Sequence, residues 1–380
     1  MTRYDYIFSG AGAAGLSLLA RMIVSGKFKD KTILVVDSSS KKNNDRTWCF
    51  WEKEPGFFEE LVYKKYNKLW FHSKSYSALN DIVPYTYKLL RGIDFYDHCI
   101  SLIRSSPNIT WQQNQVSGVH SIDGRTWIDI GGEEIEAAYI FNSIIFEKPV
   151  LKSGQYYMLQ HFKGWIIETG QEHFHEDQAT LMDFRVPQHW GTCFVYEMPF
   201  NSTRALVEYT IFSNEVLEDE IYIHQLKNYI EKILGVHDYK VLEVEDGLIP
   251  MTNFSYPLFE GNIVNIGTAG GQTKASTGYT FQFIQKQSVK IIDALDKTGK
   301  PFYEESVFDK RFALYDSTLL NILCHNKLEG ADIFTRLFQM NRMTDILKFL
   351  DNETSLAEEL KVITVLPKKH FIQAALQELL

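Results

Sequence analysis

Two short segments of the sequence carry residues whose types and spacing could do chemistry. The first is ALVEYTIFS, residues 205–213, an apolar run typical of a buried strand, with Glu208 in its middle. Because burying an ionised carboxylate is costly, a buried Glu208 would keep its proton and could act as a general acid. The alternative is an exposed acid on the wet face of an edge strand.

The second segment is GAGAAG, residues 10–15, which follows a strand-like run and opens a helical pattern. In this G-x-G-x-x-G spacing, Gly10 permits a tight turn, Gly12 lets the backbone approach a pyrophosphate, and Gly15 allows close helix–strand packing. Asp37 ends the next strand-like run, where a carboxylate can bind ribose hydroxyls. We expect a dinucleotide site made by Asp37 and the whole turn, Gly10, Ala11, Gly12, Ala13, Ala14 and Gly15. A turn without ligand and a loop-capping Asp37 are the alternatives.

The pattern of the chain around these segments predicts an α/β protein in two interleaved parts. Residues 4–37 read as strand, helix and strand, which is a parallel βαβ unit. Short strands follow over 110–146, four more over 165–213, and helical spacing dominates after residue 278. We expect a discontinuous cofactor domain (1–75, 105–150, 245–300), a substrate-binding β-sheet domain (76–104, 151–244) and a helical region (301–380).

The interruption of the Rossmann unit by a β-rich domain favours FAD over NAD as the dinucleotide. A second strand-to-glycine element, GNIVNIGTAGG from Gly261, could hold the rest of the flavin's diphosphate or ribityl chain. Its Gly267 and Gly270, with Gly278 beyond them, are therefore candidate cofactor contacts. Arg46 could bind a flavin phosphate, or instead pair with Asp45 on the surface.

Composition excludes several other classes of function. The 380 residues carry a net charge of −9 and no basic footprint, so nucleic acid is not an expected partner. The cysteines at 49, 99, 193 and 324 have no zinc, haem or redox spacing, and no metal is expected. No apolar run is long enough to span a bilayer. The N-terminal residues resemble a strand rather than a signal peptide, from which we expect a cytoplasmic location.

With these residues in view, the chain resembles the flavoprotein lycopene cyclases of carotenoid synthesis. Beyond the glycine turn, the resemblance is carried in order by NDRTWCFW (44–51), QHFKGWIIET (160–169), LMDFRV (181–186), FVYEMPFNSTRALVEYTIFS (194–213), GLIPMT (247–252) and GTAGGQTKASTGYTF (267–281). It covers nearly the first 300 residues. It implies a Rossmann-like FAD-binding domain of the flavin reductase or hydroxylase type.

The resemblance also implies a reaction, the closure of the acyclic ψ-ends of lycopene to β-rings, ending in β-carotene, without net redox. It implies a reduced FAD, with NADPH or NADH as reductant, and gives Glu208 the catalytic position. A flavin monooxygenase or prenyl-chain reductase would share the fold, and a non-catalytic flavin-binding sensor or adaptor is a further alternative. Lycopene resides in membranes, so we expect transient, peripheral contact with the inner face of the cell membrane.

Lycopene offers no heteroatom, so cyclisation has to begin with protonation of a carbon–carbon double bond by an acid in a dry pocket. If the turn between the two strands is symmetric about Asn201 and Ser202, Glu197 and Glu208 are diagonal neighbours on one face. A one-residue shift of register would place them on opposite faces. Asp183 shares a strand face with Arg185, as a structural pair or as a secondary acid–base site.

Aromatic residues could line a tunnel for the polyene. The candidates are Trp48, Trp51, Trp165, Tyr196 and Phe212, with core packing as the alternative for some of them. The helical tail offers candidates for membrane contact, for which core packing is again the alternative. They are Phe334, Leu337, Phe338, Met340, Ile346 and Phe349.

Overall fold

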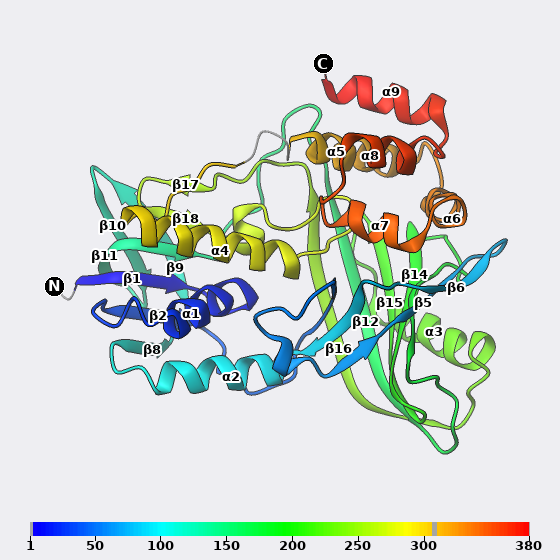
Figure 1. The fold of residues 1–380 in the computed structure, drawn as a ribbon, viewed down its shortest axis with the longest axis horizontal. Coiled ribbons are helices and arrows are strands. Elements are labelled where there is room, and N and C mark those ends of the chain that lie inside the picture. Colours follow the sequence, from blue (N-terminus) through cyan, green and yellow to red (C-terminus); the bar gives the residue numbers. More distant parts are fainter. Residues whose placement is uncertain (1–2, 306–309, 380) are drawn as a thin grey trace.

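The computed structural model describes residues 3–305 and 310–379, which form two large sheets, a small sheet and a helical tail (Figure 1). The first large sheet has eight strands, with the order β17-β18-β11-β1-β2-β8 and with β9 and β10 attached through β11. Its bounds are β1 Arg3–Ser9, β2 Ile33–Asp37, β8 Ile109–Gln113, β9 Val116–Ile122, β10 Arg125–Ile130, β11 Glu133–Asn142, β17 Phe259–Glu260 and β18 Ile263–Asn265.

The centre of this sheet is parallel and covered by helices. Strand β1 pairs in parallel with both β2 and β11, and β11 pairs in parallel with β18. Helices α1 (Ala13–Ser25), α2 (Gly92–Arg104) and α4 (Phe281–Thr298) bury apolar side chains in one cluster with β1 and β2. The expected Rossmann-like βαβ unit is therefore confirmed, and three separate stretches of chain build its sheet, residues 3–37, 109–142 and 259–265.

The second large sheet has seven strands in the order β16-β12-β15-β14-β13-β5-β6. Their bounds are β5 Lys68–His72, β6 Ser77–Asp81, β12 Tyr157–Thr169, β13 Gln178–Asp183, β14 Thr192–Asn201, β15 Arg204–Ser213 and β16 Tyr239–Thr252. All neighbours are antiparallel except β13 and β5. One face packs on α3 (Asp219–Asn228) and the π-helical turn η2 (Tyr229–Ile233), and the other belongs to the largest core cluster.

A three-stranded sheet lies between the two large sheets. It consists of β3 (Thr47–Glu52), β7 (Thr86–Arg91) and β4 (Lys64–Tyr66), in the order β3-β7-β4. Two short 3-10 turns complete the connections, η1 (Glu59–Leu61) after β3 and η3 (Gly267–Gly270) after β18. Because β3 shares side-chain contacts with both large sheets, it joins the cofactor side of the molecule to the β-rich side.

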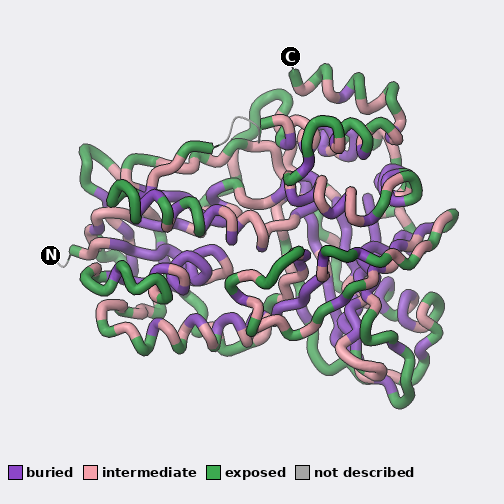
Figure 2. Tube along the Cα trace, in the orientation of Figure 1, coloured by how far each residue is buried: buried purple, intermediate pink, exposed green. Residues whose placement is uncertain are grey.

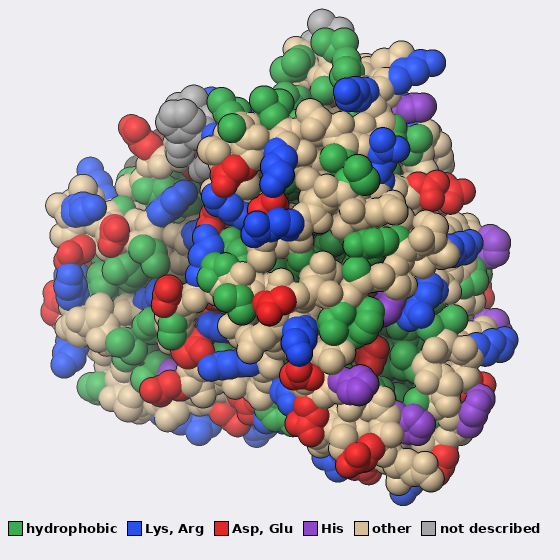
Figure 3. Space-filling view, turned by 45° about the vertical axis from the view of Figure 1, so that its right-hand side comes forward, with side chains coloured by type: hydrophobic (Ala, Val, Ile, Leu, Met, Phe, Trp, Pro, Cys, Tyr) green, Lys and Arg blue, Asp and Glu red, His purple; other side chains and the backbone are tan. Residues whose placement is uncertain are grey.

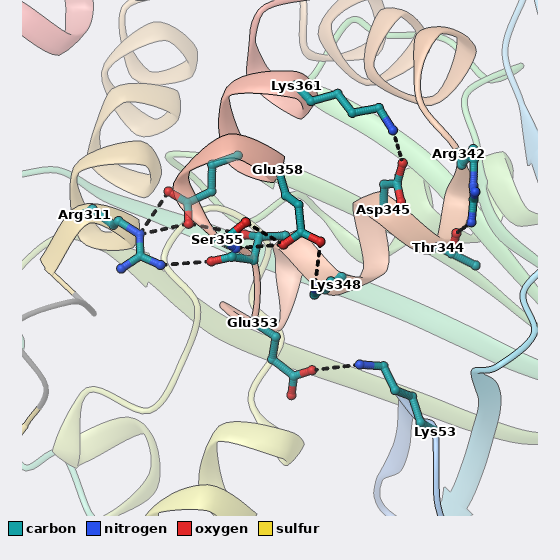
Figure 4. Close-up of polar contacts among 12 residues, drawn as sticks. Lys53, Arg311, Arg342, Thr344, Asp345, Lys348, Glu353, Ser355, Glu358 and Lys361 are labelled. Carbon is teal, nitrogen blue, oxygen red and sulfur yellow. Dashed lines mark hydrogen bonds and ion pairs between the residues drawn. The ribbon is translucent and has the colours of Figure 1, made fainter.

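Helices α5–α9 form the tail above the seven-stranded sheet (Figure 1), with bounds α5 Lys310–Cys324, α6 Gly330–Met340, α7 Met343–Leu350, α8 Leu356–Ile363 and α9 Lys368–Leu379. Polar contacts fix the turns between them (Figure 4). Ser355 and Glu358 form a capping box at the start of α8, and Glu358 also pairs with Lys348 at 2.6 Å. Lys53, after β3, pairs with Glu353 and so ties the tail to the three-stranded sheet.

The apolar face of the tail is buried against the sheet, as the purple segments of Figure 2 show. Phe338 stacks on Phe71 of β5 with ring centroids 4.4 Å apart, and Phe334 stacks on Phe184. The core-packing alternative therefore holds for Phe334, Leu337, Phe338 and Ile346, because these side chains cover the sheet, and Phe349 packs against the same cluster. Met340 is 60% exposed.

The expected domain ranges need correction in three places. Strand β5 lies in the seven-stranded sheet, because it pairs with β13, although residues 1–75 were assigned to the cofactor domain. Helix α2 belongs with the Rossmann core, since Phe95 and Cys99 pack there. Strand β16 runs through the expected boundary at residue 245 as one continuous partner of β12.

Candidate active site

The glycine turn after β1 has the geometry that its spacing predicts. Gly10 has φ +91°, and a β-carbon there would lie 2.4 Å from Ser143 Oγ. A β-carbon at Gly15 would lie 2.3 Å from the carbonyl oxygen of Gly10, so α1 packs tightly on the turn. At Gly12 a β-carbon would meet nothing within 4 Å. The turn thus presents bare backbone to open space at Gly12 and is closely packed on either side of it.

The N-terminus of α1 is suited to an anion. Its first turn contains no acidic residue, and Gly12 at the N-cap supplies no side-chain cap. Backbone N–H groups and the positive end of the helix dipole are therefore available there. Asp37, at the end of β2, accepts hydrogen bonds from the Ala11 and Ser39 amides, each at 2.7 Å, and pairs with Lys41 at 3.2 Å.

The second glycine element lies against the first. A β-carbon at Gly267 would lie 2.6 Å from Ala14 Cβ, and one at Gly270 would lie 2.1 Å from the Asn265 carbonyl oxygen. At Gly278 it would lie 2.0 Å from Gln160 Oε1, a buried atom with no hydrogen-bond partner among the described residues. The arrangement fits a dinucleotide lying across both glycine elements, with a spare acceptor at Gln160 for one of its donors.

A single cavity of about 410 Å³ joins this glycine cradle to the seven-stranded sheet. It is lined on the cofactor side by Gly12, Ala13, Ala14, Arg46, Gly267 and Gly278. Its other wall includes Glu208 and aromatic side chains, namely Trp48, Tyr87, Tyr96, Phe162, Tyr196, Tyr279 and Phe281. Glu208, the acid identified from the strand pattern, therefore lines the same cavity as the glycine turn. The two lie about 200 residues apart in the chain.

Glu208 belongs to a row of residues that crosses four strands at one level. Tyr196 on β14 faces Glu208 on β15, Glu208 faces Gly164 on β12, and Gly164 faces Glu245 on β16. Directly opposed residues of an antiparallel pair project to the same face, so all four point to the same side of the sheet. Gly164 has no side chain, which lets the carboxyl groups of Glu208 and Glu245 meet above it.

The environment of Glu208 favours its neutral form. Burial raises the pKa of Glu208 well above its usual range, and the neighbouring Glu245 carboxylate raises it further. Thr210 Oγ1 donates a hydrogen bond to Glu208 Oε1 at 3.0 Å. Burial also raises the pKa of Glu245, while a 2.7 Å hydrogen bond from Thr47 Oγ1 and the charge of Arg46 oppose that effect. The pair is thus set to hold a proton on Glu208.

The register between β14 and β15 differs from the symmetric turn considered above. Glu197 faces Val207, and Pro199 faces Ala205, with a bulge that makes Phe200 an extra residue in β14. Asn201 Oδ1 accepts hydrogen bonds from the Thr203 and Arg204 amides, which centres the turn on Ser202 and Thr203. The one-residue shift places Glu197 and Glu208 on opposite faces, so a shared site for these two acids is ruled out.

Glu197 and Asp183 lie together on the far face. Thr180 donates to Glu197 at 3.2 Å, and burial raises the pKa of Glu197 to about 7. Asp183 is fully buried and accepts hydrogen bonds from Tyr229 and from the Arg185 guanidinium. Asp183 and Arg185 therefore form a structural ion pair. Neither Asp183 nor Glu197 lines the cavity.

The predicted aromatic lining divides into two groups. Trp48 and Tyr196 line the cavity, and Tyr196 Oη lies 3.5 Å from Tyr279 Oη. Trp51 lies behind that wall, where its indole N–H donates to the Leu347 carbonyl. Trp165 is wrong as a lining residue, because it packs on the opposite face of the sheet. Phe212 is in the core beneath the tail, in edge contact with Phe334.

Sequence reasoning missed Glu245, Gly164 and Thr47. Along β16, Glu243 and Glu245 alternate with Leu242 and Val244, which predicts that the apolar pair is buried. In the structure the burial is reversed: Val244 is 55% exposed and Glu245 is 7% exposed. A glycine inside a long strand, as at Gly164, is the signal that could have indicated close approach of neighbouring side chains.

Two further findings come from the part of the chain that the structure describes. Across residues 3–305 and 310–379, no group of three or more His, Cys, Asp or Glu side chains is placed to hold a metal ion. Within the same ranges, no helix combines the length and the apolarity that crossing a bilayer requires.

Known structures share this fold at low sequence identity. A geranylgeranyl bacteriochlorophyll reductase-like protein from Thermoplasma acidophilum superposes with a TM-score of 0.71 at 12% identity, covering 99% of this chain and 100% of that one. A flavoprotein/dehydrogenase from Cytophaga hutchinsonii gives 0.62 at 12% identity, with 100% and 99% covered. A p-nitrophenol 4-monooxygenase from Pseudomonas putida gives 0.58 at 12% identity, with 100% and 98% covered. The expected flavin reductase or hydroxylase fold is confirmed.

Among curated protein sequences, none matches the chain. The family model described as lycopene cyclase protein matches residues 5–376, which is nearly the whole chain and includes the tail. The glycine cradle, the Glu208 carboxyl group at the cavity wall and this match agree. The chain belongs to the lycopene cyclase family.

Proposed function

We propose that the protein is a lycopene β-cyclase, which converts the ψ-ends of lycopene to β-rings, as an intramolecular lyase or isomerase without net redox. The observation that carries the proposal is the position of Glu208, a carboxyl group held neutral by burial at the wall of the cavity that also meets the glycine turn. Membership of the lycopene cyclase family supplies the substrate class.

The cavity wall suits a reaction that passes through a cation. Glu208 would donate its proton to the terminal double bond, the neighbouring double bond would form the ring bond, and a ring carbon would then release a proton. Tyr196 and Tyr279 present aromatic rings beside Glu208, and such rings stabilise a positive charge. With substrate bound, their ring faces would limit the access of water, which would otherwise capture the cation.

We propose FAD as the cofactor, bound between the two glycine elements. Gly10–Gly15 and the N-terminus of α1 would hold the diphosphate, Asp37 the ribose, and Arg46, Gly267, Gly270 and Gly278 the remaining length of the molecule. When bound and reduced by NADPH or NADH, FAD supplies negative charge that stabilises a neighbouring cation. Because Asp37 already binds the Ala11 amide, it would serve the ribose while keeping the turn in place.

An anaerobic reaction separates this proposal from its alternatives. Protein with reduced flavin is incubated with lycopene in the absence of oxygen. The products are separated by chromatography, and their molecular masses are measured by mass spectrometry. A cyclase yields a ring product of unchanged mass and leaves the flavin reduced. A prenyl-chain reductase oxidises the flavin and adds hydrogen, a monooxygenase stays idle without oxygen, and a sensor or adaptor yields no product. Any of these last three results would refute the proposal.

We also propose transient contact with the inner, cytoplasmic face of the cell membrane, through α8 and α9 rather than through the residues first considered. Ile372, Leu376 and Leu379 recur along one side of α9 and are 57%, 56% and 67% exposed. Leu356 and Leu360 of α8 are 61% and 55% exposed. Hydrophobic side chains are visible at the top of the molecule beside the C-terminal end (Figure 3). An apolar helix side next to the exposed lysines at 368 and 369 suits a lipid surface.

A further inference from the structure

We propose that Glu245 is a positioning residue for the proton on Glu208, so that the two carboxyl groups, joined across Gly164, hold one proton between them at the cavity wall. This inference rests on the proposed cyclisation and deepens it. Glu208 lines the cavity and would touch the substrate, whereas Glu245 does not line the cavity and acts through Glu208.

The backbone register brings the two acids together. Gly164 on the central strand β12 is directly opposite Glu208 on one side and Glu245 on the other. A β-carbon at Gly164 would lie 3.0 Å from Glu245 Cγ and 3.0 Å from Leu206 Cδ1. A larger residue at this position would press on the Glu245 side chain, so the missing side chain gives Glu245 room to lie over Gly164.

The hydrogen bonds around the pair indicate which acid carries the proton. Thr47 Oγ1 donates to Glu245 Oε2 at 2.7 Å, so this oxygen acts as an acceptor. Glu245 Oε1 is buried and has no hydrogen-bond partner among the described residues. The interaction between the two side chains raises the pKa of Glu208 and lowers that of Glu245, as expected when a protonated Glu208 is the donor. Glu208 is therefore the donor and Glu245 the acceptor of the shared proton.

The charged groups around the pair agree with this assignment. Arg46, before β3, favours the ionised form of Glu245, whereas Glu243, two residues along β16, disfavours it. An ionised Glu245 in turn strengthens the hold of Glu208 on its proton. Cys49 of β3, Tyr196 of β14 and Tyr279, just before α4, also lie beside Glu208. They are neutral at pH 7, since burial raises the pKa of each.

The pair gives the proposed reaction a closed proton cycle. Glu208 passes its proton to the terminal carbon–carbon double bond, a carbon–carbon bond closes the ring, and the cation is formed beside two carboxylates. Two like charges at short distance disfavour this state, so Glu208 takes a proton back from the ring carbon as the new double bond forms. One proton enters and one leaves, no electron is exchanged, and the acid is restored for the next ring.

An infrared titration of the purified holoprotein tests the pair independently of activity. The C=O band of protonated Glu208 is identified by its loss in Glu208→Gln, and its midpoint is measured as pH rises. Glu245→Gln removes the neighbouring charge and should lower the midpoint by on the order of one pH unit or more. Glu168→Gln removes a carboxylate of the same kind near the end of β12, where it pairs with Arg204, and should leave the midpoint unchanged.

The same variants have a matching readout in cyclisation. The alkaline limb of the pH–rate profile should move to lower pH in Glu245→Gln by the same amount as the infrared midpoint, and not in Glu168→Gln. An unchanged midpoint in Glu245→Gln would overturn the proposal. If that variant does not fold, Gly164→Ala decides in its place, because separating the carboxyl groups should also lower the midpoint. A lowered midpoint in a protein that never cyclises lycopene would refute only the proposed function.

Discussion

Glu197 and Glu208 lie on neighbouring strands, 11 residues apart in the chain, yet they project from opposite faces of the same sheet. Glu208 faces the cavity beside Tyr196 and Glu245, and Glu197 faces Thr180 and the buried Asp183. Burial raises the pKa of both acids. The two positions therefore predict different consequences, one for catalysis and one for stability.

Replacing Glu208 tests its role as the acid. Glu208→Gln keeps the shape of the side chain but removes the transferable proton, so cyclisation should fall by about 10²–10⁴-fold or to background. FAD content, measured from the flavin absorbance of the purified protein, should not change, because Glu208 lies on the sheet wall of the cavity. Glu168→Gln, at an exposed pair with Arg204 near the end of β12, is the matched control. Full turnover in Glu208→Gln would rule out this acid.

Glu197 should control the pH dependence of stability instead. Its pKa rises from 4.5 to about 7 on folding. Its stabilising contribution is therefore complete below pH 4.5 and is lost as pH rises to about 7. Across that window the slope due to this group is about 1.4 kcal/mol per pH unit. Denaturant unfolding of Glu197→Gln at several pH values should show a flatter profile than the unchanged protein, and equal slopes would contradict the assignment.

Substitutions at the second and third glycines of the turn, Gly12 and Gly15, should have different effects. Gly12→Leu would place a side chain in open space next to the cavity, so the protein should fold but lose FAD. Gly15→Ala would bring a methyl group against the backbone oxygen of Gly10, and overpacking of this kind costs about 1–3 kcal/mol. Flavin content and thermal unfolding distinguish the two outcomes. A stable, FAD-loaded Gly12→Leu protein would show that the cofactor does not approach this turn.

The lipid surface proposed on α9 can be tested by one added charge. Leu376→Glu should weaken cosedimentation with phospholipid vesicles by roughly tenfold or more, since burying a leucine side chain is worth about 1.5–3 kcal/mol. Gln373→Glu adds the same charge to the same helix at an exposed position without removing apolar surface. It should bind vesicles nearly as well as the unchanged protein. Equal binding of all three would place the contact elsewhere.

Several parts of the fold and of the site follow from local sequence pattern. The strand, glycine turn and helix at residues 4–25 follow from apolar spacing and from the backbone freedom of Gly10, and the strand around Glu208 follows from its apolar neighbours. Asp37 is the last residue of β2, the position that the apolar run before it predicts. These features are encoded by residues within about one element of each other, so no tertiary information is needed to find them.

Tertiary structure alone decided which acids meet. The bulge at Phe200 set the face of Glu197, and the pairing of β16 with β12 brought Glu245 to Glu208 across Gly164. It also decided that the apolar side of α6 and α7 covers the sheet rather than a membrane. The physical reason is the two-residue period of a strand: one inserted residue reverses the face of every side chain beyond it. Alternation along β16 could not reveal the buried acid, because the groups that lie against Glu245, Thr47 of β3 and Glu208 of β15, come from distant parts of the chain.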